Sequence, residues 1–307
     1  MKIRGKYKKI NPIYIFYVVL GFLAVAAPVR MYQLLNIIES DTGFYSAIDG
    51  SVYFMYAAAL TAIVIIYVLV MLAKNIPASK APNKRSILLA VCSFLFALGL
   101  MIDVITLISS LGASASYSEF TASVAVVPAI LEIVFGTLAA IYIMVFGISY
   151  LNGRIVYLRY KFLALTPLFW SMSRIVIRFV RKIAYINVSD LMLEIFALVF
   201  MMIFFLAFAR ISSGLSNDKA MRSLFASGFV GVFFCLTANI PRLIMLLTGH
   251  MDRLPDEYPF ALCDVAFALF ALAYILNAVR SARVNDSTEL NANSIQTDEV
   301  DTDDFAE

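Results

Sequence analysis

Long apolar stretches separated by short polar segments set the pattern of this sequence. A helix needs about 20 mostly apolar residues to cross a bilayer. Seven stretches meet this requirement with at most one charged residue each, and an eighth, residues 162–184, carries four basic side chains. The predicted spans are residues 10–29, 52–73, 86–111, 122–147, 162–184, 191–209, 223–248 and 258–279. The pattern therefore predicts an all-α, polytopic transmembrane helical bundle with eight spans in four hairpins.

The composition supports lipid as the solvent for most of the chain. Of the 307 residues, 62% are hydrophobic and only 15% are charged, against about 25% charged in a typical soluble protein. The mean hydropathy is +0.87. A soluble domain of this size cannot hide so much apolar surface from water. These values exclude an ordinary cytosolic enzyme, a disordered chain and a nucleic-acid-binding domain.

The basic residues predict the orientation of the spans. Most of the 24 Lys and Arg residues lie before the first span, after the last, or in every second loop, whereas the loops on the other side contain only Arg253. Cytoplasmic loops carry the excess of Lys and Arg. We therefore expect both termini in the cytoplasm, in a bacterial cytoplasmic (plasma) membrane. Anionic lipid headgroups explain the basic loops, so membrane lipids are expected partners and nucleic acid is not.

The chain divides into three parts by composition. Residues 1–11 form a basic cytoplasmic N-terminus, residues 12–283 the eight-helix transmembrane domain, and residues 284–307 an acidic tail. The tail has eight acidic and no basic residues and is rich in Asn, Ser, Thr and Asp. A segment so polar and so highly charged cannot bury enough apolar surface to fold, so we expect a disordered cytoplasmic tail.

The hairpins resemble one another in the position of their charged residues. The entering helices align at Arg30, Asp103, Arg174 and Arg242, and three returning helices align at Glu132, Glu194 and Asp264. If the similarity reflects duplication, all repeats enter from the same side, and their symmetry axis runs along the membrane normal. Chance alignment of low-complexity apolar sequence is the alternative.

Charged residues within the spans form one layer. A charge at the bilayer centre costs about 2.5–3.5 kcal/mol, so these side chains should face the bundle interior and find partners. At about 1.5 Å per residue, the layer leans toward the outer half of the membrane. Its members are Arg30, Asp103, Glu132, Arg174, Arg178, Arg181, Lys182, Glu194, Arg242 and Asp264.

The fifth span carries a basic stripe, because Arg174, Arg178, Arg181 and Lys182 share one helix face. Three interpretations stay open. The acids pair with the arginines and fix helix register, or the stripe lines an outward-opening cavity that binds an anion through forked guanidinium donors. In the third, this segment is an amphipathic helix in the membrane interface.

No sequence motif of an enzyme or of a metal or cofactor site appears. The three cysteines are scattered and His250 is the only histidine, so neither a metal site nor a cofactor is expected.

We therefore predict a non-enzymatic transporter or sensor that binds an anionic small molecule or lipid headgroup. The alternative is a structural or regulatory subunit whose buried charges pair only with each other. Among the predicted ligand-binding residues, Arg174, Arg178 and Arg242 hold the anion. Glu194 and Asp264 neutralise the empty site or carry a coupled proton. Asp103 and Glu132 complete the predicted set.

Overall fold

The computed structural model describes most of the predicted transmembrane domain. The described residues are 12–39, 44–46, 49–73, 85–114, 119–153, 159–180, 188–215, 218–250, 254 and 260–281. The predicted N-terminal segment 1–11 and the acidic tail 284–307 lie outside these residues, as do Arg181 and Lys182 of the basic stripe.

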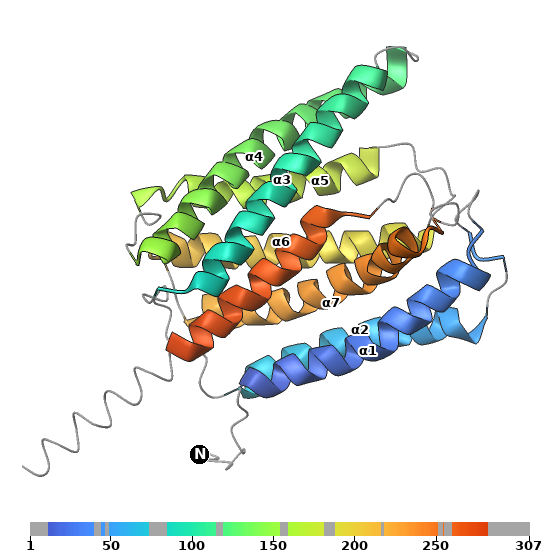
Figure 1. Ribbon diagram of the computed structural model, residues 1–307, viewed down its shortest axis with the longest axis horizontal. Helices are drawn as coiled ribbons and strands as arrows, with labels where there is room; N and C mark the ends of the chain where they lie inside the picture. Colours follow the sequence, from blue (N-terminus) through green and yellow to red (C-terminus); the bar gives the residue numbers. More distant parts are fainter. Residues whose placement is uncertain are drawn as a thin grey trace, which may run out of the picture.

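Eight helices in the described residues are long and apolar enough to cross a membrane. Seven carry labels in Figure 1, and the eighth is the unlabelled C-terminal helix Leu262–Ser281, drawn in red. The labelled helices are α1 (Pro12–Asn36), α2 (Gly50–Leu72), α3 (Ile87–Ser114), α4 (Glu119–Asn152), α5 (Thr166–Val180), α6 (Val188–Ser212) and α7 (Asp218–Thr248). No strand occurs in the described part of the chain. The predicted all-α bundle of eight spans is confirmed.

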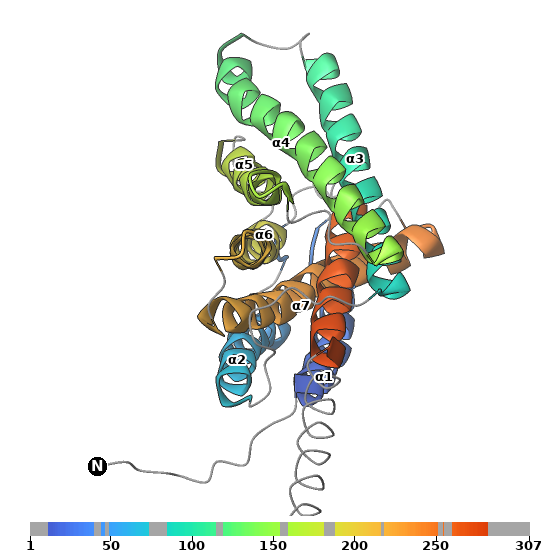
Figure 2. The same ribbon diagram turned by 90° about the vertical axis from the view of Figure 1, so that its left-hand side faces the viewer.

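The helices pair in sequence order and then stack side by side. The pairs α1–α2, α3–α4 and α5–α6 pack together, and α7 packs on α6, α1 and α2. Figures 1 and 2 show the α1–α2 and α3–α4 hairpins at opposite ends of the stack, with α5, α6 and α7 between them. The C-terminal helix packs against α7, where a side chain at Gly231 would touch the ring of Phe267. The middle helices are therefore covered by protein on more sides than α1 and α2.

Several helices run past the predicted span ends. Helix α1 continues through Pro28 and Arg30 to Asn36, and α6 begins at Val188 instead of residue 191. Apolar runs alone predict the shorter limits, because a polar side chain ends the run. The helices continue because the polar side chains at these ends find partners inside the protein, which lowers the cost of burying them.

The fifth predicted span is shorter than expected but lies within the bundle. Helix α5 packs between α4 and α6 and is preceded by the 3-10 helix η2 (Leu163–Leu165). Its Trp170 is completely buried. An interfacial helix would leave one face toward headgroups and water. Contact with helices on two sides is instead typical of a membrane span in a bundle.

An aromatic core joins α3, α4, α6 and the C-terminal helix. The ring of Phe96 stacks on Phe205 and Phe270 at centroid distances of 5.8 and 5.5 Å. Gly99 lets α3 approach the C-terminal helix, since a Cβ atom there would lie 3.1 Å from the Cα of Cys263. This close contact holds Asp264, the next residue, against the bundle interior.

Candidate ion-pair site

Most charged residues of the described spans are buried within the protein, as predicted. The buried charged side chains are Arg30, Glu132, Arg174, Asp190, Glu194, Arg242 and Asp264. Ion pairs between helices involve Arg30, Arg174, Asp190, Glu194, Arg242 and Asp264. Charge in lipid is costly, and an inward side chain with an opposite charge avoids much of that cost.

The ion pairs gather at one end of the bundle. Arg30 and Arg242 lie near the ends of α1 and α7, whereas Asp190 and Glu194 lie near the beginning of α6. Asp264 lies in the first turn of the C-terminal helix. Alternate helices run in opposite directions, so these positions meet at the same level. This is the end that the positive loops predict to be outward.

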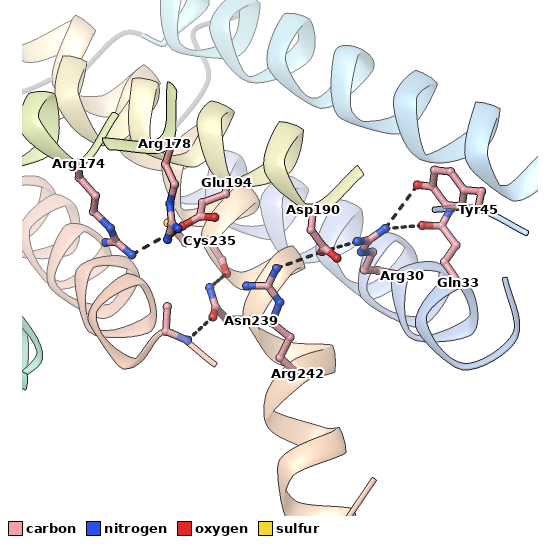
Figure 3. Close-up of polar contacts among 11 residues, drawn as sticks. Arg30, Gln33, Tyr45, Arg174, Arg178, Asp190, Glu194, Cys235, Asn239 and Arg242 are labelled. Atoms are coloured by element: carbon pink, nitrogen blue, oxygen red, sulfur yellow. Dashed lines mark hydrogen bonds and ion pairs between the residues drawn. The ribbon is translucent and has the colours of Figure 1, made fainter. Parts of the chain in front are cut away.

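Helix α6 supplies the two carboxylates that connect the network. Asp190 and Glu194 are four residues apart, so they share a helix face and sit one turn from each other. Figure 3 shows them side by side, with Arg30 and Arg242 around Asp190 and Arg178 beside Glu194. The network therefore has two groups, each built on one acid of α6.

In the first group, Asp190 accepts hydrogen bonds from two arginines. Its Oδ1 atom accepts a hydrogen bond from Nη2 of Arg30, and Nη2 of Arg242 lies 3.0 Å from the same oxygen. Nη1 of Arg30 also donates to Oε1 of Gln33 at 3.0 Å and to the Tyr45 hydroxyl at 3.4 Å. The group joins α1, α6 and α7 through one shared carboxylate (Figure 3).

Helices α1 and α7 run side by side in the same direction at this group. Phe22 contacts Phe233 through their rings, and Arg30 and Arg242 meet at the same acid. These are two of the positions that align in the predicted repeat. Two of the aligned arginines thus lie close together in the structure.

Amide side chains fix the surrounding backbone. The Gln33 amide donates to the Ser51 carbonyl at 3.0 Å, which ties α1 to the start of α2. The Asn239 amide donates to the Cys235 carbonyl, and its Oδ1 accepts from the backbone N–H of Ala261, both at 3.0 Å. The Asn239 contact holds the entry to the C-terminal helix against α7 (Figure 3).

In the second group, two arginines of α5 meet two acids from different helices. Nη1 of Arg174 lies 2.7 Å from Oδ1 of Asp264, and Nη2 of Arg178 lies 2.5 Å from Oε1 of Glu194. Nη2 of Arg174 is also 3.9 Å from the same Glu194 oxygen. The Arg174 guanidinium lies 5.5 Å from the centre of the Trp170 ring, a cation–π distance.

The predicted site residues are distributed over the network. Arg174, Arg178, Glu194 and Asp264 come together in the second group. Arg242 belongs to the first group, one helical turn away along α6. Asp103 of α3 lies within electrostatic range of Arg174, and its Oδ2 has no hydrogen-bond partner in the described part of the chain. Glu132 is buried in α4.

Asp190, Gln33 and Tyr45 are not among the predicted site residues. Asp190 precedes the apolar run of its span, so the pattern places it in an outer loop. Two features could have found it: an acid favours the first turn of a helix, and the spacing of four to Glu194 places both on one face. Tyr45 lies between α1 and α2 and gives no comparable pattern in the sequence.

The arrangement holds charge but shows no metal-ligand cluster. Within the described residues, no group of three or more His, Cys, Asp or Glu could hold a metal ion. Asp190 Oδ2 and Glu194 Oε2 are buried without a hydrogen-bond partner among those residues. Each α6 acid thus presents one oxygen to two guanidiniums.

Comparison with known proteins gives no relative on which to base a function. No protein-family model, curated protein or solved structure matches the chain. The chain is a multi-pass integral membrane protein with eight apolar helices, in which buried arginines pair with Asp and Glu.

Proposed function

We propose that the protein is a non-enzymatic transporter or sensor that binds an anionic small molecule or a lipid headgroup at Arg174 and Arg178. The observation that carries this proposal is the shared carboxylate of Glu194, which lies 2.5 Å from Arg178 and 3.9 Å from Arg174. A position that holds one carboxylate group between two guanidiniums suits a carboxylate or phosphate of a ligand equally well. Glu194 then neutralises the site while it is empty.

The exposure of Arg178 supports entry at this point. Its side chain is 18% exposed, whereas the side chains of Arg30 and Arg174 are 1% and 5% exposed. A ligand that approaches from the predicted outer side reaches Arg178 first. Arg174 lies one helical turn deeper and is held by Asp264, so it provides the second donor once Glu194 moves away.

A structural or regulatory subunit is the second candidate. The observation in its favour is the burial of the first group, in which the side chains of Arg30, Arg242 and Asp190 are only 1%, 4% and 1% exposed and pair with one another. Polar and ionic contacts often hold membrane helices together. In this role the arginines would fix helix positions and would bind no ligand.

Substitution of Arg178 by glutamine distinguishes the two candidates. For a binding protein, inorganic phosphate, succinate or a short-chain phosphatidylglycerol raises the melting temperature of the purified wild type, and Arg178→Gln abolishes that rise. The melting temperature without ligand changes little, because Arg178 is the most exposed arginine of the network. Arg210→Gln, an exposed position near the other end of α6, is the matched control and keeps the response.

The structural candidate predicts the opposite result. In that case Arg178→Gln lowers the melting temperature without ligand or prevents insertion, and none of the three anions stabilises the wild type. A wild type that no anion stabilises, together with an unstable Arg178→Gln variant, rejects the binding proposal.

A further inference from the structure

A groove with an apolar part and a polar part lies at the end of the bundle opposite the ion pairs. This groove of about 540 Å³ runs along α4 and is closed on one side by the segment before α5. Its lining includes Ile141, Val145 and Ile148 in the span, then Asn152 and Tyr160 at the end of the span. The groove therefore changes from apolar to polar along its length.

The length of the groove matches one leaflet of a bilayer. From Ile141 to Asn152 the helix rises about 16 Å, and half of the hydrocarbon core is about 15 Å thick. Helix α4 ends at this level, since Gly153 follows Asn152 with a φ of 67°, a conformation that ends helices. The polar end of the groove thus lies where headgroups begin.

Two basic residues lie next to the polar end of the groove in the chain. Arg159 and Lys161 flank Tyr160, and both are exposed. The loop that contains them is one of those whose basic residues predict a cytoplasmic position. An exposed guanidinium and ammonium beside a groove at headgroup level attract the phosphate of an anionic lipid.

We infer that this groove is a binding site for an anionic phospholipid of the phosphatidylglycerol type. One acyl chain lies along Ile141, Val145 and Ile148, and the phosphate contacts Arg159 and Lys161. Asn152 and the Tyr160 hydroxyl provide hydrogen bonds to the headgroup. The groove is remote from Arg174 and Arg178, so this inference is independent of the function proposed above.

Native mass spectrometry of the purified full chain tests the site. Dioleoylphosphatidylglycerol and dioleoylphosphatidylcholine are added in equal amounts, and the lipids retained by the protein are counted. We expect the wild type to retain the anionic lipid preferentially. Arg159→Gln with Lys161→Gln should reduce that preference at least about fivefold, because each basic residue near the headgroups contributes to anionic lipid attraction.

Two further variants separate the groove from general surface charge. Arg210→Gln with Arg280→Gln removes two exposed basic residues at the same end of the bundle but outside the groove, and should leave the preference unchanged. Ile148→Trp fills the groove without a change of charge and should also reduce retention of the anionic lipid. Melting temperatures in detergent verify that each variant is folded.

Three results would overturn the inference. The wild type could retain phosphatidylcholine as well as phosphatidylglycerol, or the control pair could lose the preference as strongly as the Arg159 and Lys161 pair. Full retention by a folded Ile148→Trp variant would reject the groove as the position of the acyl chain.

Discussion

Asp190 forms ion pairs with two arginines from different helices, Arg30 of α1 and Arg242 of α7. It is 1% exposed, as is Arg30, so neither charge has access to water. Removal of one partner of a buried ion pair leaves an uncompensated charge, which typically costs about 3–5 kcal/mol. We expect Asp190→Asn to reduce the free energy of unfolding by about this amount, measured by thermal or denaturant unfolding in detergent.

The control for this substitution is Glu39→Gln, which removes an acid at an exposed position just after α1. Exposed ion pairs contribute about 0–1 kcal/mol, so this variant should melt close to the wild type. A double-mutant cycle with Arg30→Gln should give a coupling energy between Arg30 and Asp190 of about 0.5–3 kcal/mol. Equal stability of Asp190→Asn and Glu39→Gln would show that the first group does not hold the helices together.

At the scale of the helices, close packing of α3 on the C-terminal helix positions Asp264 for Arg174. Gly99 permits this approach, because an added Cβ would meet the Cα of Cys263 and the Cβ of Ala266 at 3.1 and 3.4 Å. Backbone atoms cannot move aside as a flexible side chain can. We expect Gly99→Val to reduce stability by about 1–3 kcal/mol, the usual cost of overpacking.

Gly21 offers a matched control on the outside of the bundle. A Cβ atom at Gly21 in α1 meets nothing within 4 Å. Gly21→Val should therefore leave the melting temperature within a few degrees of the wild type, whereas Gly99→Val lowers it clearly. A similar loss from both substitutions would mean that the change of residue type, and not the contact with Cys263, is responsible.

At the scale of the whole molecule, the orientation in the membrane is a prediction from the basic loops. It can be measured with single cysteines, because Cys92, Cys235 and Cys263 are buried and should react slowly. A membrane-impermeant maleimide applied to intact cells should label Ser46→Cys, between α1 and α2. It should leave Leu215→Cys, between α6 and α7, unlabelled until the cells are opened.

Both positions are exposed in the structure, so a difference in labelling reports the side of the membrane and not burial in the protein. Labelling of Leu215→Cys alone in intact cells would reverse the orientation and would place both termini outside. In that case the ion-pair network would lie at the cytoplasmic end of the bundle, and the approach of a ligand would have to be sought from the cytoplasm.

The number of spans and the inward direction of their charges could be predicted because both depend on local properties. The length of an apolar run decides whether a helix can cross the bilayer, and the cost of charge in lipid turns Arg174, Arg242 and Glu194 inward wherever their helices pack. The predicted helix ends were less accurate, as at the start of α6, because an apolar run ends at a polar residue while the helix continues past it.

The amino-acid sequence alone is thus sufficient to predict an eight-span bundle with a buried layer of ionic side chains. Which acid meets which arginine depends on the packing of the helices. Arg30 and Asp190 are 160 residues apart, and the α1–α2 hairpin lies at one edge of the stack while α3–α4 lies at the other. Pairing at such separations depends on how whole helices pack, which no local pattern of apolar and polar residues specifies.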